Sequence, residues 1–215
     1  MITSYLPLLA QGTYISILCW LSSGIASLLI GTFCAIISSK YGTCKNASRI
    51  ISCYTFVAKG VPVYVQILIA YFVLPSLLGI NLSPFVAGVL ALAFCSGGYV
   101  TTIIRSGINA IPLGQWQAAY VLGYSNMQTM QRIILPQALR IILPTLFGEF
   151  EQLLKSSSLL ATIGILELTR SGMNIISREL NPMPVYLTVA AIYLIFSALL
   201  AGLQKIVITG GSDEN

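Results

Sequence analysis

Two carboxylates, Glu149 and Glu151, lie within a long apolar segment and are the first acidic residues of this 215-residue chain. Lys155 follows Glu151 by four residues, the order that favours an ion pair on one face of a helix. Glu149 has Gln152 and Leu153 at the corresponding positions and therefore has no local cation. Because a helix turns by about 100° per residue, the two carboxylates point about 200° apart and meet different surroundings.

An unpaired carboxylate in apolar surroundings costs several kcal/mol or becomes protonated, so Glu149 needs a partner. Two roles are open. Glu149 could face a pathway through the protein and meet the ammonium or guanidinium group of a solute, or it could be structural, hydrogen-bonded to another helix or across a subunit interface. Gln66, a polar residue inside another apolar segment, is a second pathway candidate. For Lys155 the alternative is a side chain that extends its ammonium group towards water at the edge of the apolar segment.

The residue types needed for catalysis are scarce. The chain has no histidine, and its single aspartate is Asp213. An enzyme acting within apolar surroundings would need a nucleophile–base pair or metal ligands, so we expect no catalytic residue, metal or cofactor. The cysteines form no C-x-x-C pair, which favours small packing residues over a metal or redox site: Cys19, Cys34, Cys44, Cys53 and Cys95.

The composition indicates a protein in a lipid bilayer. Only 8% of the residues are charged and 56% are hydrophobic, whereas soluble domains are about a quarter charged. The net charge is +5, but the basic residues are sparse and adjoin apolar stretches, which excludes a basic face for nucleic acid. Most of the surface must therefore be solvated by lipid.

The charge-free stretches, divided where proline, glycine and asparagine gather, predict an all-α membrane protein of about five transmembrane helices in one domain, 1–215. Each stretch can cross about 30 Å of hydrocarbon at about 1.5 Å per residue. The predicted spans are 13–37, 52–76, 84–105, 137–160 and 185–204. In the first span, small residues recur every four positions at Ser23, Ser27 and Gly31, which predicts either a close helix contact or a lipid-facing stripe.

Basic residues near the span ends set the predicted orientation. They gather in the loop after the first span (Lys40, Lys45, Arg49) and around the loop between the third and fourth spans (Arg105, Arg132, Arg140). The N-terminus and the loop between the second and third spans have none. The positive-inside rule then places the N-terminus outside, the C-terminus inside and the loop 106–136 in the cytoplasm.

That loop contains a spaced motif. Residues 114–136 read GQWQAAYVLGYSNMQTMQRIILP. This resembles the signature loop of binding-protein-dependent ABC importer permeases, which is E-A-A, three residues, Gly, nine residues and I-x-L-P. The spacing matches throughout, with one departure at Gln117, where the family usually has Glu.

The physical properties of the loop agree with this resemblance. Ala118 and Ala119 are helix formers with small side chains, which would let a partner surface approach the helix closely. Gly123 suits the position just after a helix, and 124–133 can begin a second short helix. Such a helix–turn–helix could lie in a groove of a soluble partner, and the alternative is an ordinary amphipathic connector between spans.

The resemblance covers roughly residues 10–205. Lys59-Gly60-Val61-Pro62 followed by Gln66 looks like the R-G-x-P…Q segment of the polar amino-acid branch. Residues 99–108 resemble that branch's stretch before the loop, and residues 135–159 match its fourth-helix pattern. The chain departs from that branch at three positions: Thr102 for Glu, Gly148 for Asn and Ser156 for Asp.

The resemblance implies the permease subunit of an ATP-driven importer with the type I fold, multi-pass in the bacterial plasma (inner) membrane. It implies a second permease subunit, identical or a sister, two cytosolic ATP-binding subunits and an extracytoplasmic substrate-binding protein. The chain lacks the Walker-A pattern, so nucleotide is expected on the partner and this subunit is not expected to be an enzyme. The residues expected to couple to the ATPase are Gly114, Gln115, Gln117, Ala118, Ala119, Gly123 and Pro136.

The implied cargo is a polar amino acid, with arginine or glutamine favoured, and it would pass Glu149 and Gln66. Two alternatives stay open, namely an ABC permease for another small solute such as methionine and a passive membrane channel. A channel would have no reason to carry the spacing of the docking loop.

Overall fold

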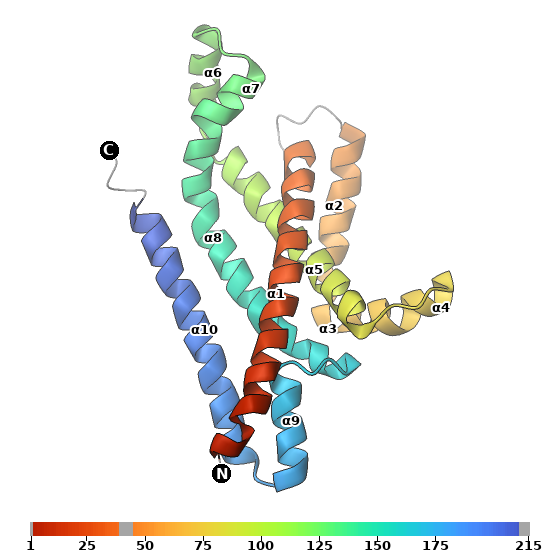
Figure 1. Ribbon diagram of the computed structural model, residues 1–215. Coiled ribbons are helices and arrows are strands. Elements are labelled where there is room, and N and C mark those ends of the chain that lie inside the picture. The colour runs from red at the N-terminus through yellow and green to blue at the C-terminus, as the bar shows by residue number, and fades with distance from the viewer. Residues whose placement is uncertain (1, 39–44, 211–215) are drawn as a thin grey trace.

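The computed structural model describes residues 2–38 and 45–210, which form helices joined by short turns (Figure 1). This confirms the all-α prediction for the part of the chain that is described. Lys40, Cys44 and the acidic residues Asp213 and Glu214 lie outside it. The elements in order are α1 (Ile2–Ser38), α2 (Lys45–Gly60), α3 (Val63–Leu68), the π-helix η1 (Ile69–Val73), α4 (Leu74–Leu78), α5 (Pro84–Asn109), α6 (Leu113–Val121), α7 (Asn126–Thr129), the π-helix η2 (Met130–Ile134), α8 (Leu135–Ser156), the 3-10 helix η3 (Ser157–Ile163), α9 (Leu168–Glu179) and α10 (Pro182–Gly210).

Four helical segments of the described chain are long and apolar enough to cross a membrane: Tyr5–Ser38, Pro84–Asn109, Asn126–Ile163 and Pro182–Ile208. They overlap four of the predicted spans. The fifth candidate is the pair Asn46–Gly60 and Val63–Leu78, which meet at 103°. The predicted second span, 52–76, is therefore not one straight helix. The cause is local, because Pro62 lacks an N–H group and its ring clashes with the preceding turn, so α2 ends at Gly60.

The two π-helical turns of the described chain have the same sequence context. Each directly precedes a Leu-Pro pair, Leu74-Pro75 after η1 and Leu135-Pro136 after η2. A proline within a helical run leaves a carbonyl of the preceding turn without its N–H partner. Widening that turn to the π pattern re-registers the hydrogen bonds and lets the chain continue as a helix.

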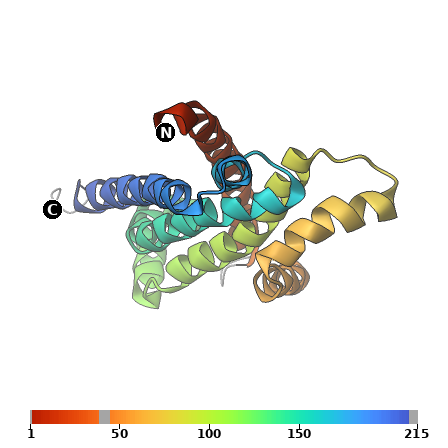
Figure 2. The same ribbon diagram turned by 90° about the horizontal axis from the view of Figure 1, so that it is seen from below.

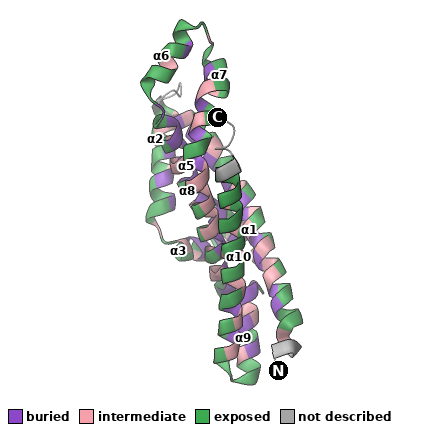
Figure 3. Cartoon of the chain, turned by 90° about the vertical axis from the view of Figure 1, so that its left-hand side faces the viewer, coloured by how far each residue is buried: buried purple, intermediate pink, exposed green. Residues whose placement is uncertain are grey.

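Helix α5 occupies the centre and packs against α1, α2, α3 and α8. Ser23 and Ser27 of α1 are fully buried, and a Cβ atom at Gly31 would overlap Val100 of α5. This confirms the close helix contact predicted for the small-residue stripe and rules out the lipid-facing alternative. The last helix, α10, is largely exposed along its length (Figure 3).

Different helices form the two ends of the molecule. Helices α6 and α7 extend beyond the bundle at the end where α10 finishes, while the N-terminus and α9 lie at the opposite end (Figure 1). Viewed from below, α10 and the α3–α4 arm lie on opposite sides of the α5–α8 pair (Figure 2). The described basic residues Arg49, Arg105, Arg132 and Arg140 lie towards the α6–α7 end, so that end is cytoplasmic and α9 is extracytoplasmic.

The contact at Gly31 predicts opposite effects for the same substitution at two glycines of α1. Gly31→Ala should destabilise the protein by about 1–3 kcal/mol, because the added methyl group overpacks the contact with Val100. Gly24→Ala places a Cβ atom at ordinary contact distance, 3.6 Å from Phe150, and should be neutral or stabilising because alanine is a better helix former. Thermal unfolding of both variants in detergent measures the difference, and equal melting temperatures would contradict it.

Candidate functional site

A cavity of about 330 Å³ lies where the α2–α3 junction meets α5 and α8. Three parts of the chain that are separated in sequence contribute polar groups to it, among them Lys59 before the bend, Ser96 on α5 and Glu149 on α8. The complete lining is Lys59, Val61, Pro62, Val63, Leu92, Cys95, Ser96, Tyr99, Glu149, Gln152, Leu153 and Ser156. The cavity therefore depends on the tertiary fold and on no single helix.

Glu149 is bonded to a neighbouring helix and also lines the cavity. Its Oε1 atom accepts a hydrogen bond of 2.7 Å from Ser96 Oγ, so the side chain is tied to a neighbouring helix. The same carboxylate lines the cavity, and it forms no ion pair with any residue that the structure describes. One oxygen is thus oriented by the protein while the group as a whole can still receive a cation from the cavity.

Lys59 supplies positive charge at the bend. Its Nζ atom donates to Thr102 Oγ1 at 3.2 Å and lies 5.8 Å from the centroid of the Tyr99 ring. Thr102 occupies the position where the resembling branch commonly has Glu, and it gives the ammonium group a neutral partner. In the sequence Lys59 was evident only as part of a motif, and the fold brings it to the cavity that Glu149 also lines; a basic residue next to a Gly-x-Pro break was the available signal.

Gln66 does not line the Glu149 cavity. Its Nε2 atom donates to the carbonyl oxygens of Ala58 at 2.9 Å and of Val61 at 2.7 Å, which bridges the 103° bend. The side chain is buried and borders a separate, mainly apolar cavity of about 470 Å³. The pathway role of Gln66 stays a prediction, and the hydrogen bonds that its side chain forms lie across the bend next to Lys59.

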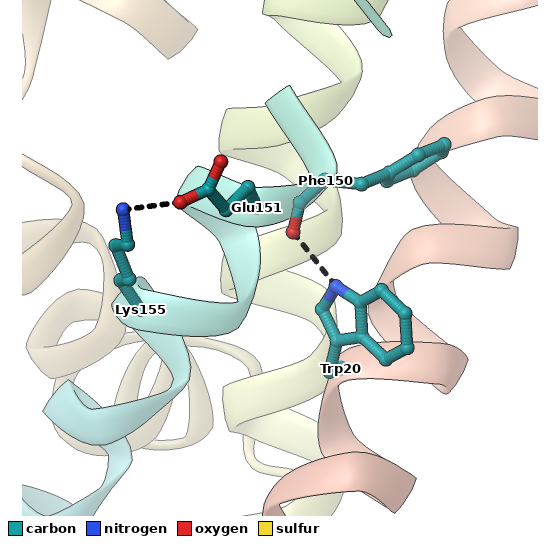
Figure 4. Close-up of polar contacts among 4 residues, drawn as sticks. All are labelled: Trp20, Phe150, Glu151 and Lys155. Atoms are coloured by element: carbon teal, nitrogen blue, oxygen red, sulfur yellow. Dashed lines mark hydrogen bonds and ion pairs between the residues drawn. The ribbon is translucent and has the colours of Figure 1, made fainter. Parts of the chain in front are cut away.

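Glu151 faces away from Glu149, as the helical geometry predicted. Lys155 Nζ lies 2.7 Å from Glu151 Oε1, which confirms the predicted ion pair (Figure 4). The pair leaves Lys155 with a local partner. On another side of α8, Trp20 Nε1 of α1 donates to the Phe150 carbonyl oxygen at 2.8 Å, so α8 is anchored directly beside Glu149.

The motif loop forms a helix–turn–helix at the cytoplasmic end. Helix α6 ends in a Schellman turn, in which Tyr124 N donates to Ala119 O and Gly123 N donates to Tyr120 O. Gly123 has a φ of +77°, the left-handed region that favours glycine. Ser125 then caps α7 with a capping box completed by Gln128. The predicted turn at Gly123 and the predicted second helix are both present.

The loop exposes apolar side chains that its own fold does not need. Tyr120, Val121 and Leu122 are exposed, with Val121 at 83%. Among the predicted coupling residues, those with exposed side chains or backbone are Gly114, Gln115, Gln117, Ala118, Gly123 and Pro136. Ala119 is fully buried within the chain itself whereas Ala118 is exposed, and the coupling role of both stays a prediction. The π-helix η2 packs against α6.

Glu167 is a buried acidic residue whose role was not evident from the sequence. It precedes α9, is fully buried, and accepts hydrogen bonds from Thr169 N at 2.9 Å and Arg170 N at 2.7 Å. Burial raises the pKa of its carboxyl group above the ordinary value, against the opposing effect of these N–H groups and the Tyr193 hydroxyl. A lone acidic residue ending an apolar run was the sequence signal for a helix N-cap.

Comparison with known proteins shows the family to which the chain belongs. The family model described as "Binding-protein-dependent transport system inner membrane component" matches residues 27–210. The chain belongs to this family. The match spans the bend, the Glu149 cavity and the cytoplasmic loop, and it makes the protein a multi-pass inner-membrane transport component, as the resemblance implied.

Individual permeases agree with this membership. The chain is 33% identical to the glutamine transport system permease protein GlnP of Escherichia coli (strain K12) over 199 residues, 91% of this chain and 89% of that protein. It is 32% identical to the L-cystine transport system permease protein TcyB of Bacillus subtilis (strain 168) over 205 residues, 95% of this chain and 86% of that protein.

Two solved structures share the fold. The structure described as "Crystal structure of an amino acid ABC transporter with histidines" superposes with a TM-score of 0.89 at 33% identity, covering 97% of this chain and 96% of that chain. An inward facing conformation of the MetNI methionine ABC transporter gives 0.79 at 17% identity, with 95% and 96% coverage, and is similar in fold alone. The predicted type I ABC importer permease fold is confirmed.

The bridging role of Gln66 in this permease can be tested with two substitutions of similar length. Gln66→Met removes the donor, and Gln66→Glu in addition places carboxylate oxygens against the carbonyl oxygens of Ala58 and Val61. Unsatisfied buried groups cost about 1–3 kcal/mol each, so both variants should melt at a lower temperature than the wild type, and Gln66→Glu should be the less stable. A Gln66→Glu variant as stable as the wild type would show that the bend does not depend on these bonds.

Proposed function

We propose that this chain is the permease subunit of an ATP-driven importer that moves polar amino acids into the cytoplasm, with arginine or glutamine favoured. The observation that carries the proposal is the Glu149 cavity, in which a lysine ammonium group borders the same space as a carboxylate that has no ion-pair partner among the described residues. The names of the relatives, which include glutamine and arginine permeases, support the substrate class.

The charges of the cavity suit a zwitterion. Every α-amino acid carries an ammonium group that could donate hydrogen bonds to Glu149. It also carries a carboxylate that Lys59 could bind once Lys59 gives up its contact with Thr102. A guanidinium group would meet Glu149 in the same way, which keeps arginine among the favoured substrates. Ser96 holds the carboxylate in place, so little side-chain freedom is lost when a substrate binds.

ATP hydrolysis by the partner would be coupled to transport through the cytoplasmic loop. We infer that α6 and its exposed residues lie in a groove of a cytosolic ATP-binding subunit, one for each of two permeases, while an extracytoplasmic binding protein delivers the substrate. The exposed apolar side chains of Tyr120, Val121 and Leu122 support this, because an unpartnered apolar cluster beside water marks an interaction surface. Gln117 would contribute a hydrogen bond where the family usually has a charge.

Glu149→Gln should lower uptake of the transported amino acid by about tenfold or more, because a charged hydrogen bond is replaced by a neutral one. Uptake into proteoliposomes containing the complete transporter, with ATP inside, measures this. Glu151→Gln is the matched control, since it makes the same change on the same helix outside the cavity. Unchanged uptake of every amino acid by the Glu149→Gln transporter would contradict a role of Glu149 in the substrate pathway.

Val121→Asp should abolish co-purification of the ATP-binding subunit without lowering the melting temperature of the permease. Val121 is 83% exposed, and a carboxylate there would be desolvated in an apolar groove. Leu180→Asp is the control, because Leu180 is 84% exposed at the other end of the molecule and Asp tolerates its left-handed backbone. Equal recovery of the ATPase with both variants would contradict docking through α6.

A further inference from the structure

The side chain of Glu167 joins three helices at the extracytoplasmic end. Besides the two N–H groups of α9, its Oε2 atom accepts a hydrogen bond of 3.1 Å from the Tyr193 hydroxyl of α10. Ser16 of α1 lies 3.5 Å from the same atom, and its hydroxyl accepts from Leu168 N at 3.0 Å. A single buried carboxylate therefore fastens the start of α9 to both α1 and α10.

Close packing reinforces this junction on both sides. A Cβ atom at Gly12 of α1 would come within 2.5 Å of Ser171 Oγ, and one at Gly172 of α9 would come within 2.9 Å of Val189 of α10. The apolar side of α9 is buried in the same place, with Leu168 and Ile175 almost fully covered. Helix α9 consequently cannot shift without moving α1 and α10.

The same junction is connected to the Glu149 cavity through the chain. Ser156 lines the cavity at the end of α8, and η3 follows it directly and leads to Glu167. Leu160 of η3 is fully buried, and its side chain would lie 2.6 Å from a Cβ atom at Gly88 of α5. The segment from Ser156 to α9 is thus packed at both ends, and displacement of α9 would be transmitted to the cavity.

An ordinary helix cap would not require this arrangement. A serine or aspartate at the surface can cap a helix, whereas burying the larger glutamate costs several kcal/mol unless further donors are supplied. The extra donors here come from α1 and α10, and Thr169 Oγ1 also lies 3.3 Å from the Tyr193 hydroxyl. The carboxylate therefore connects separate helices in addition to capping one.

We propose that Glu167 is a positioning residue that makes α9, α1 and α10 respond as one unit when the extracytoplasmic binding protein contacts α9. This rests on the proposed function, since it assigns the site through which substrate delivery is sensed. Tyr193 and Ser16 are the connections to the spans, and the two N–H bonds of the cap hold Glu167 in place between them.

The test uses Tyr193→Phe, which removes the hydroxyl of α10 that contacts Glu167 and Thr169 and leaves the two N–H bonds of the cap and the ring intact. Tyr186→Phe is the matched control, because Tyr186 lies on the same helix with an exposed ring. In reconstituted complete transporters we expect Tyr193→Phe to lower the ratio of binding-protein-stimulated to basal ATPase about fivefold, the effect of one hydrogen bond. Basal ATPase, recovery of the complex and the ratio in Tyr186→Phe should be unchanged.

Two results would overturn the inference. One is a ratio in Tyr193→Phe equal to that in Tyr186→Phe, and the other is a parallel fall in basal and stimulated rates with less assembled complex, which indicates a role in folding alone. Glu167→Ala removes all of the bonds and should lower the ratio further in whatever complex assembles. A wild-type complex that no amino-acid-loaded binding protein stimulates would instead overturn the proposed function, and this inference with it.

Discussion

A bilayer tolerates a break in a helix only where the freed backbone groups find partners, and Gln66 supplies them at the bend of the second span. Its Nε2 atom bonds to the carbonyl oxygens of Ala58 and Val61, on either side of Gly60. Without such bonds, carbonyl groups at membrane depth would each cost several kcal/mol. Because Lys59 and Pro62 line the Glu149 cavity, the position of that wall depends on this one side chain.

The rest of the molecule divides into a rigid centre and two exposed ends. Glycine and small residues on α1 and α5 allow close backbone approach, as at Gly31 against Val100, so the centre has little freedom to adjust. The ends carry the surfaces that a partner can reach, α6 with its apolar side chains in the cytoplasm and α9 outside. Glu167 ties the outer end to two spans, and α8 connects the cavity to both ends along one continuous helix.

The cytoplasmic loop shows how far local sequence can carry a structural prediction. Gly123, Ser125 and Gln128 act within a few residues of one another, so the turn and the start of the second helix follow from short-range hydrogen bonds. The orientation of Ala119 does not, because it depends on η2, which returns against α6 from a later part of the chain. The same distinction separates the Glu151–Lys155 pair, which was predictable within one helix turn, from the Ser96–Glu149 bond between α5 and α8.

By itself the sequence determined that the chain is helical and that it crosses a membrane with its basic loops inside, and it predicted the turn and the second short helix within residues 114–136, because charge distribution, hydropathy and turn chemistry are local properties. Only the tertiary structure decided that the second span bends by 103°, that Gln66 holds the bend, and that Lys59 and Glu149 share a cavity. It also decided the role of Glu167, whose donors on α1 and α10 are distant in sequence. These features arise where helices meet, and helix packing sets them through contacts that no spacing within one helix encodes.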